Sequence, residues 1–174
     1  MPNPDYANAE NPYRERRVSA SPRCDILVGD VRAVLRTLPS ESVHCVVTSP
    51  PYHGLRDYGV EGQIGSETSL GEWVATMVDV FREVRRVLRS DGTLWLNLGD
   101  SYAGQGGGAQ GKTGQRADRT FTAKSRGCTS DGLKPKDMCG QPWRVAFALQ
   151  ADGWWLRSDI IWHKPAPMPS SVRD

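Results

Sequence analysis

Apolar and polar residues follow one another along this chain in two rhythms, one typical of helices and one typical of strands. The clearest helical rhythm begins at Ser69 and ends near Leu88. Ser69 and Glu72 form a predicted capping box, in which each side chain accepts a hydrogen bond from the other residue's backbone. One apolar stripe is expected to face the core: Leu70, Trp73, Val74, Met77, Phe81, Val84 and Leu88.

Two shorter helices are expected on either side of this one. Asp30 is placed to cap a helix whose apolar residues keep helical spacing until Pro39 ends it. A later helix is expected over about residues 141–150, with Pro142 in its first turn, where a missing N–H has no helical partner to lose.

Four short apolar segments predict strands over residues 24–29, 43–47, 93–98 and 154–162. The second and third are expected to be buried, and a turn at Asp91 and Gly92 precedes the third. Because strands alternate with helices, the chain is expected to form an α/β sheet. The tryptophans of the last two segments are expected to pack in the interior: Trp95, Trp154, Trp155 and Trp162.

Three segments follow neither rhythm. Residues 1–22 are rich in Asn, Pro, Ser and Arg and are expected to form a loose arm before a domain over 23–174. Residues 54–68 have the composition of a polar, glycine-rich loop, and 100–137 that of a long flexible loop. Residues 101–136 hold seven basic side chains against two acidic ones, which fits either contact with phosphates or a solvated loop.

Bulk composition narrows the class of protein. The formal net charge of +2 is too small to indicate nucleic-acid binding, so any such contact must come from local patches. Four cysteines without a CxxC pair, and three histidines, argue against a metal site, and Cys24 and Cys45 are expected to pack as small apolar residues. No apolar run approaches the ~20 residues of a membrane span, and the N-terminus lacks a charged and apolar leader, so we expect a cytoplasmic protein.

The segment Thr48-Ser49-Pro50-Pro51-Tyr52 directly follows the predicted strand 43–47. The carboxyl end of a strand in an open α/β sheet faces the ligand crevice, so chemistry is expected here. Two prolines make the turn stiff and remove two N–H donors, which leaves the Ser49 and Pro50 carbonyls short of backbone partners. A fixed hydroxyl, free carbonyls and a projecting phenol ring suit the binding of a planar ring that carries an amino group.

This segment resembles motif IV, (S/T/D/N)-P-P-(Y/F/W), of the DNA amino-methyltransferases that modify the exocyclic nitrogen of cytosine or adenine. The resemblance extends over roughly residues 24–174 and is closest to the permuted members, whose catalytic motif precedes the cofactor motif. It implies a Rossmann-like sheet and S-adenosylmethionine as the methyl donor. It also implies double-stranded DNA as the partner, with the target base flipped out of the helix.

The resemblance implies roles for individual residues. Ser49 and Pro50 would accept hydrogen bonds from the target amine, Pro51 would stiffen the turn, and Tyr52 would stack on the base. Asp30 and Thr48 would lie by the cofactor, although Asp30 is equally placed to cap a helix and can do both. Asn97 and Asp100 are further candidates for contact with substrate or cofactor. Within the basic loop, the candidates for contact with DNA are Lys112, Arg116, Arg119, Lys124 and Arg126.

One family feature is missing from this sequence. Permuted members carry a Phe-x-Gly-x-Gly-like motif that wraps the methionine part of the cofactor, and no such motif is present. We therefore expect the N-terminal part of a methyltransferase sheet, with apolar strand edges left unpaired and a complementing C-terminal polypeptide as a possible partner. Serine in the first motif position favours cytosine-N4 as the target. Adenine-N6, an RNA or protein-amide substrate, and a non-catalytic DNA-binding remnant are the alternatives.

Overall fold

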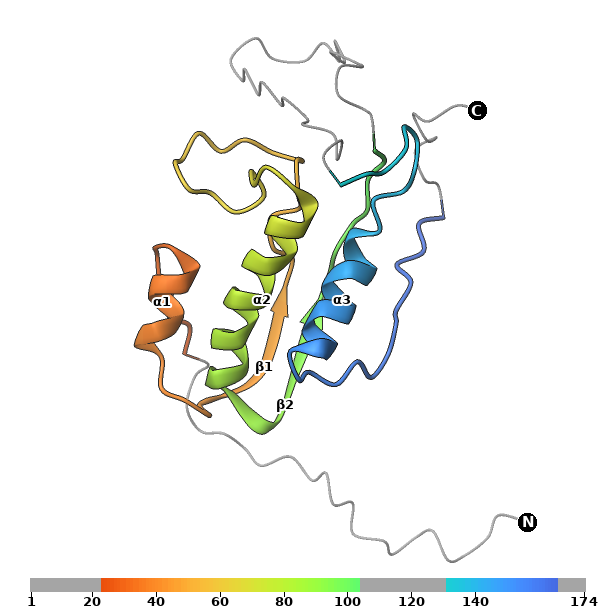
Figure 1. Cartoon of the computed structure of the whole chain (residues 1–174). Coiled ribbons are helices and arrows are strands. Elements are labelled where there is room, and N and C mark those ends of the chain that lie inside the picture. The colour runs from red at the N-terminus through yellow and green to blue at the C-terminus, as the bar shows by residue number, and fades with distance from the viewer. Residues whose placement is uncertain (1–22, 104–130, 166–174) are drawn as a thin grey trace, which may run out of the picture.

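The computed structural model describes residues 23–103 and 131–165 (Figure 1). The predicted arm at 1–22 and the five candidate DNA-contacting residues between 112 and 126 lie outside the described residues. The elements follow the expected α/β alternation, in the order α1 (Val31–Thr37), β1 (Val43–Thr48), α2 (Leu70–Val87), β2 (Leu88–Leu96) and α3 (Gln141–Ala151).

The three predicted helices are confirmed, and so are their predicted starts. Asp30 caps α1, and its side chain accepts hydrogen bonds from the backbone of Arg32 and Ala33. The Ser69–Glu72 capping box of α2 forms in both directions. Pro142 stands in the first turn of α3, as expected.

The strands β1 and β2 pair in parallel, with Val47 opposite Trp95 and Thr48 opposite Leu96. The predicted turn at Asp91 and Gly92 is wrong, because β2 already begins at Leu88 and the two residues lie within it. Leu88 pairs with Val43, but the next pair joins Cys45 to Thr93, so the register shifts around Asp91 and Gly92. The sequence signal for a turn therefore marks an irregularity in the ladder.

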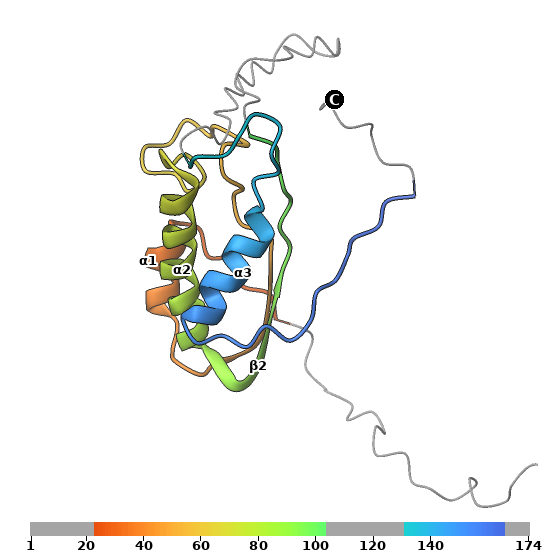
Figure 2. The ribbon, with the colours of Figure 1, turned by 45° about the vertical axis from the view of Figure 1, so that its right-hand side comes forward.

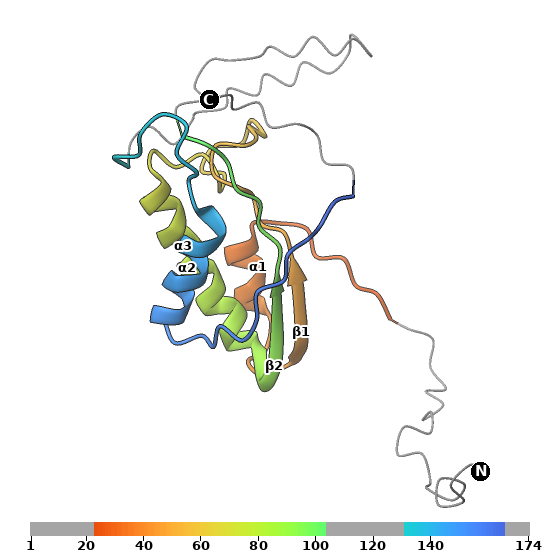
Figure 3. The ribbon, with the colours of Figure 1, turned by 90° about the vertical axis from the view of Figure 1, so that its right-hand side faces the viewer.

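All three helices lie on the same side of the two strands (Figures 2 and 3). Helix α2 lies at the centre of this layer and contacts α1, α3 and β2. Its predicted apolar stripe faces the core, where Trp73, Met77 and Phe81 are almost wholly buried. The buried core consists of Leu70, Trp73, Met77, Phe81, Val84, Leu88, Ala103, Cys139, Val145 and Leu149.

The predicted strands at 24–29 and 154–162 are not formed. Val28 is 92% exposed and Trp155 85% exposed, so the expected packing of Trp155 is wrong, as is that of the exposed Trp162. Trp154 is half-buried and does pack against the core. A strand needs a neighbour to hydrogen-bond with, and in the described part of the chain β1 and β2 pair only with each other.

The sheet face that points away from the helices is open within the described residues. Val47 is 78% exposed and its sheet neighbour Trp95 is 52% exposed, so the expected burial of Trp95 is wrong. The expected burial of the strands holds for the side that faces the helices, where Val46 and Leu94 pack against the core. Cys24 and Cys45 are exposed too, contrary to expectation. Both strands are rich in apolar residues, as is usual in parallel sheets that are covered on both faces. Here the three helices cover one face of the two strands (Figures 2 and 3).

Part of the predicted loop over 100–137 is ordered. Ala103 is buried in the core, and Tyr102 forms an isolated antiparallel bridge with Met138. Among the described residues, no helix is long and apolar enough to cross a membrane. Within the same ranges, no group of His, Cys, Asp and Glu side chains is arranged to hold a metal ion.

Candidate active site

The Ser49–Tyr52 turn begins where the β1–β2 ladder ends. Asn97 donates its backbone N–H to the Thr48 carbonyl at 2.9 Å, which extends the parallel ladder by one bond. The next donor from this side would be the N–H of residue 50, and Pro50 has none. Pro50 therefore ends the pairing of β1 with β2, and the turn that follows lies at the carboxyl end of β1.

The side chain of Asn97 holds the Ser49 hydroxyl. Asn97 Nδ2 donates a hydrogen bond of 3.0 Å to Ser49 Oγ, and both residues are exposed to solvent. A hydroxyl has two lone pairs, so Ser49 Oγ retains one acceptor site for a ligand. Asn97 therefore lies beside the motif residue Ser49, and its contact with substrate or cofactor stays a prediction.

The carbonyl groups of the two prolines differ in their surroundings. Pro51 accepts a 3.0 Å hydrogen bond from the buried indole Nε1 of Trp73 in α2. Pro50 and Ser49 accept none from the described residues, as the sequence predicted. One carbonyl of the turn thus anchors it to the core, while the carbonyl beside Ser49 stays available to a ligand.

The Tyr52 ring rests against backbone that carries no side chain. A Cβ atom added to Gly99 would lie 3.0 Å from Tyr52 Cε2, so the glycine allows the ring to lie close to the end of β2. On the other side, a Cβ atom at Gly65 would lie 2.9 Å from the Tyr52 carbonyl oxygen, and the φ of +97° at Gly65 also favours glycine. Gly99 thus makes room for the ring, Gly65 makes room for the Tyr52 backbone, and the Tyr52 side chain is half-buried.

A buried glutamine links the turn to the rest of the domain. Gln141, 1% exposed, accepts a hydrogen bond from the His53 backbone N–H at 3.2 Å and donates to Ser101 Oγ at 2.9 Å. Gln141 was not predicted from the sequence as a residue of the site. The one sequence feature that could have indicated it is its place directly before Pro142, at the start of a helix. Both the oxygen and the nitrogen of this buried amide form hydrogen bonds, so Gln141 holds the segments around His53 and Ser101 at a fixed distance.

Asp100 has a structural role in this arrangement. Its carboxylate accepts hydrogen bonds from the backbone N–H groups of Gly140 at 3.0 Å and Gln141 at 3.1 Å, so it caps α3 from another segment. The sequence had marked Asp100 as a candidate for contact with substrate or cofactor. Its hydrogen bonds to the helix start compensate for the lack of a side-chain cap at Gly140, and its contact with substrate or cofactor stays a prediction.

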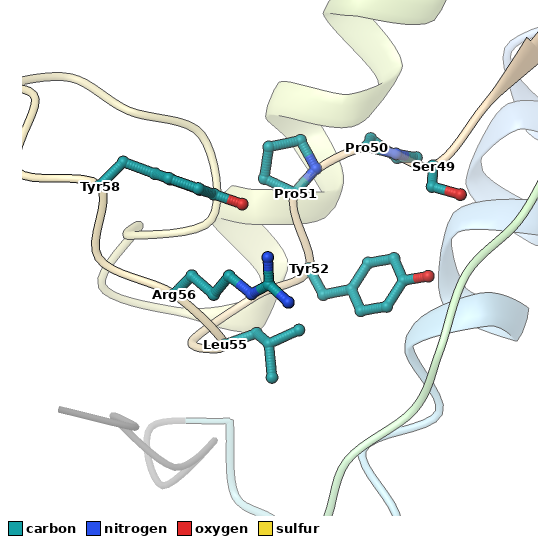
Figure 4. Close-up of a pocket in the computed structure, with 7 residues that line it drawn as sticks. All are labelled: Ser49, Pro50, Pro51, Tyr52, Leu55, Arg56 and Tyr58. Carbon is teal, nitrogen blue, oxygen red and sulfur yellow. The ribbon is translucent and has the colours of Figure 1, made fainter. Parts of the chain in front are cut away.

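A pocket of about 260 Å³ opens beside the turn (Figure 4). Three of its residues, Leu55, Arg56 and Tyr58, come from the loop that sequence reasoning treated only as polar and glycine-rich. An arginine next to aromatic residues is a common pattern in proteins that bind bases, and this signal was available in the sequence. The pocket is lined by Ser49, Pro50, Pro51, Tyr52, Leu55, Arg56 and Tyr58.

The two predicted cofactor residues are already engaged within the chain. The Asp30 carboxylate caps α1 and forms an ion pair with Arg32 at 3.0 Å, and this hydrogen-bonded guanidinium lowers the pKa of Asp30. The Thr48 carbonyl is part of the β ladder. Pockets that enclose whole drug-sized ligands span about 300–1,000 Å³. The pocket beside the turn is therefore large enough for a single base and is smaller than the usual site of a whole cofactor.

These features define an α/β protein with a base-sized pocket, lined by hydrogen-bond acceptors and a ring, at the carboxyl end of a parallel strand. The chain belongs to the DNA methylase family whose model covers N6- and N4-specific enzymes, and the match runs over residues 43–174. Members of this family use S-adenosylmethionine. The expected family and fold class are thereby confirmed.

Individual relatives support the assignment. The type II methyltransferase M.SmaI of Serratia marcescens is 55% identical over 151 residues, which are 87% of this chain and 51% of that protein. The type II methyltransferase M.Cfr9I of Citrobacter freundii is 55% identical over 150 residues, or 84% of this chain and 48% of that protein. The chain thus spans about half the length of these curated relatives.

A solved structure shows a more distant likeness. It is a putative DNA modification methylase of Thermus thermophilus in complex with S-adenosyl-L-methionine, 22% identical in sequence, with a TM-score of 0.47. The alignment covers 82% of this chain and 49% of the other.

Proposed function

We propose that this chain supplies the target-base site of a DNA methyltransferase that modifies the exocyclic N4 amine of cytosine. The observation that carries the proposal is the pairing of two acceptors, Ser49 Oγ and the Pro50 carbonyl, beside the Tyr52 ring in one pocket. The methyl group is supplied by S-adenosylmethionine, the donor that the family uses.

The two acceptors address the weak nucleophilicity of an aromatic amine. The nitrogen lone pair is delocalised into the ring, so the amine attacks a methyl group only as it becomes tetrahedral. Acceptors aimed at its two N–H bonds favour that geometry and stabilise the positive charge that develops on nitrogen. As the new N–C bond forms, the methyl group leaves its sulfur, and one amine proton passes to solvent afterwards.

Tyr52 accounts for binding of a base outside the duplex. The target amine is engaged in pairing within the helix, so the base must be flipped, at a cost of a few kcal/mol. Stacking of a base on an aromatic side chain contributes about 1–3 kcal/mol, and hydrogen bonds to the base add to this. Gly99 allows the Tyr52 ring to lie close to the end of β2, beside the place proposed for the base.

Cytosine is proposed over adenine because serine occupies the first position of the motif, which resembles the cytosine-N4 enzymes. The basic residues between 101 and 136 are proposed to bind phosphates of the duplex. A further polypeptide segment is proposed to cover the open face at Val47 and Trp95, because the relatives are about twice as long as their match to this chain.

The test is transfer of a tritiated methyl group from S-adenosylmethionine to unmethylated DNA. The chain is assayed alone and mixed with the part of the Serratia marcescens relative that this chain does not match. Ser49→Ala is expected to lower the rate about a hundredfold, as loss of one transition-state hydrogen bond does. Ser90→Ala, an exposed serine outside the pocket, is the matched control and is expected to leave the rate unchanged.

Hydrolysis of the DNA then identifies the product. N4-methylcytosine supports the proposal, and N6-methyladenine replaces the proposed base with the alternative one. DNA binding with no methyl transfer in either mixture, and with no effect of Ser49→Ala, would point to a non-catalytic DNA-binding remnant.

A further inference from the structure

Arg56 differs from most arginines in the described part of the chain, because its guanidinium lacks a protein partner there and lines a pocket. Arg36 and Arg157 also make no side-chain hydrogen bond or ion pair with the described residues, but they do not line this pocket. The arginines that are held by an acidic side chain or a backbone carbonyl are Arg23, Arg32, Arg82, Arg85, Arg86, Arg89 and Arg144.

The backbone from the Arg56 carbonyl to the Tyr58 N–H is held by one residue, Gln63. Gln63 Nε2 donates to the Arg56 carbonyl at 2.9 Å, and Gln63 Oε1 accepts from the Tyr58 N–H at 2.7 Å. The neighbouring carboxylate of Asp57 accepts a hydrogen bond from the Gly59 N–H at 2.8 Å. The loop therefore presents Arg56 and Tyr58 from a backbone that is organised before a ligand binds.

Arg56 and Tyr58 extend into the pocket from the side opposite Ser49. Figure 4 shows the guanidinium and the Tyr58 hydroxyl directed toward Pro51 and Tyr52, with Ser49 beyond them. Both side chains carry hydrogen-bond donors, and a guanidinium matches two phosphate oxygens at once. An anion with several acceptor oxygens is the ligand that suits this end of the pocket.

The geometry of a nucleotide places such an anion there. In cytosine, the N4 amine and the N1 atom that bears the sugar lie at opposite ends of the ring. A base whose amine meets Ser49 and Pro50 therefore directs its sugar and phosphate toward the far side of the pocket. We infer that Arg56, assisted by the Tyr58 hydroxyl, binds the phosphate adjoining the flipped nucleotide and so sets how deeply the base enters. This inference rests on the proposed function.

The test compares 2′-deoxycytidine with its 5′- and 3′-monophosphates, titrated against the full chain and followed by tyrosine and tryptophan fluorescence. The chain is expected to bind one monophosphate about tenfold more tightly than the nucleoside, as a charge-assisted hydrogen bond provides. Arg56→Ala is expected to remove this ratio and leave the affinity for the nucleoside unchanged. Arg56→Lys retains the positive charge but cannot bind two phosphate oxygens at once. This variant is expected to keep part of the preference for the monophosphate over the nucleoside.

Arg36→Ala is the matched control, since Arg36 is exposed and lies outside the pocket, and it is expected to keep the full ratio. Equal affinity of the unaltered chain for nucleoside and monophosphates would overturn the phosphate site while leaving the base site intact. An equal loss of both affinities in Arg56→Ala would also overturn it and would place Arg56 on the base. Failure of deoxycytidine itself to bind would overturn the base site, and the phosphate site with it.

Discussion

The indole Nε1 of Trp73 donates a hydrogen bond of 3.0 Å to the carbonyl oxygen of Pro51. Trp73 is fully buried in α2, so this bond ties the turn at the end of β1 to the centre of the core. It also engages one of the two proline carbonyls and leaves the other available. The position of the turn is thus set by a residue that the sequence pattern assigned only to core packing.

Replacing Trp73 with Phe is expected to lower the free energy of unfolding by about 2–4 kcal/mol, because the Pro51 carbonyl loses its donor and the smaller ring leaves a cavity. Urea denaturation followed by circular dichroism measures the change. Trp95→Phe is the control, since the Trp95 indole is 52% exposed, and its cost should stay within about 0.5 kcal/mol. Equal effects of the two substitutions would show that Trp73 does not anchor the turn.

Gln141→Leu is expected to destabilise the domain by about 2–4 kcal/mol. The substitution keeps a side chain of similar size but removes the acceptor for the His53 N–H and the donor to Ser101 Oγ. Gln150→Leu changes an exposed glutamine at the other end of the same helix and is expected to cost less than about 0.5 kcal/mol. Unfolding by urea compares the two variants, and similar midpoints would contradict a linking role for Gln141.

Gly99→Ala is expected to displace the Tyr52 ring, because the new Cβ atom would lie 3.0 Å from Tyr52 Cε2. Overpacking of this kind costs about 1–3 kcal/mol, and the affinity for deoxycytidine should fall with it. Gly71→Ala in α2 is the matched control, since its nearest contact would be at 3.9 Å and alanine favours a helix. Calorimetric titration of the nucleoside would contradict the expectation if both variants bound it like the parent chain.

Arg32→Gln is expected to return the pKa of Asp30 toward its ordinary value of 3.8, because the Arg32 side chain is the main cause of the lowered pKa. A lowered pKa in the folded state means that ionised Asp30 stabilises the fold above pH 3.8 and that this stabilisation is lost as the pH falls through the lowered pKa. Carboxyl carbon NMR measures both titrations. Asp91 provides the internal control, because its lowered pKa depends on Arg89 and should not move.

Local sequence signals were sufficient for the helices and for the turn at the end of β1. The capping residues Asp30 and Ser69 fix helix starts through bonds to residues two or three positions away, so no tertiary information is needed. The Ser49–Tyr52 turn is equally local, because the prolines restrict φ and remove donors wherever the chain lies. These predictions held for that reason.

Strands and site partners depend on contacts between distant segments, and here the sequence was less informative. Segments 24–29 and 154–162 have strand composition but no strand beside them in the described structure, and their apolar residues other than Trp154 are exposed. Trp95 has core composition and lies on an open sheet face. An apolar residue reveals a tendency to be buried, whereas burial itself depends on what packs against it.

The sequence by itself determined the α/β class, the three helices with their caps, and the acceptor-rich turn at the end of β1, because each depends on neighbours along the chain. Only the tertiary structure decided which proline carbonyl remains available to a ligand. Trp73 lies in another element, α2, and donates its hydrogen bond to the Pro51 carbonyl. The same holds for Gln141 and Asn97, which reach the turn across 88 and 48 residues of chain. Hydrogen bonds between distant segments form only after the core has brought those segments together, and sequence spacing does not encode them.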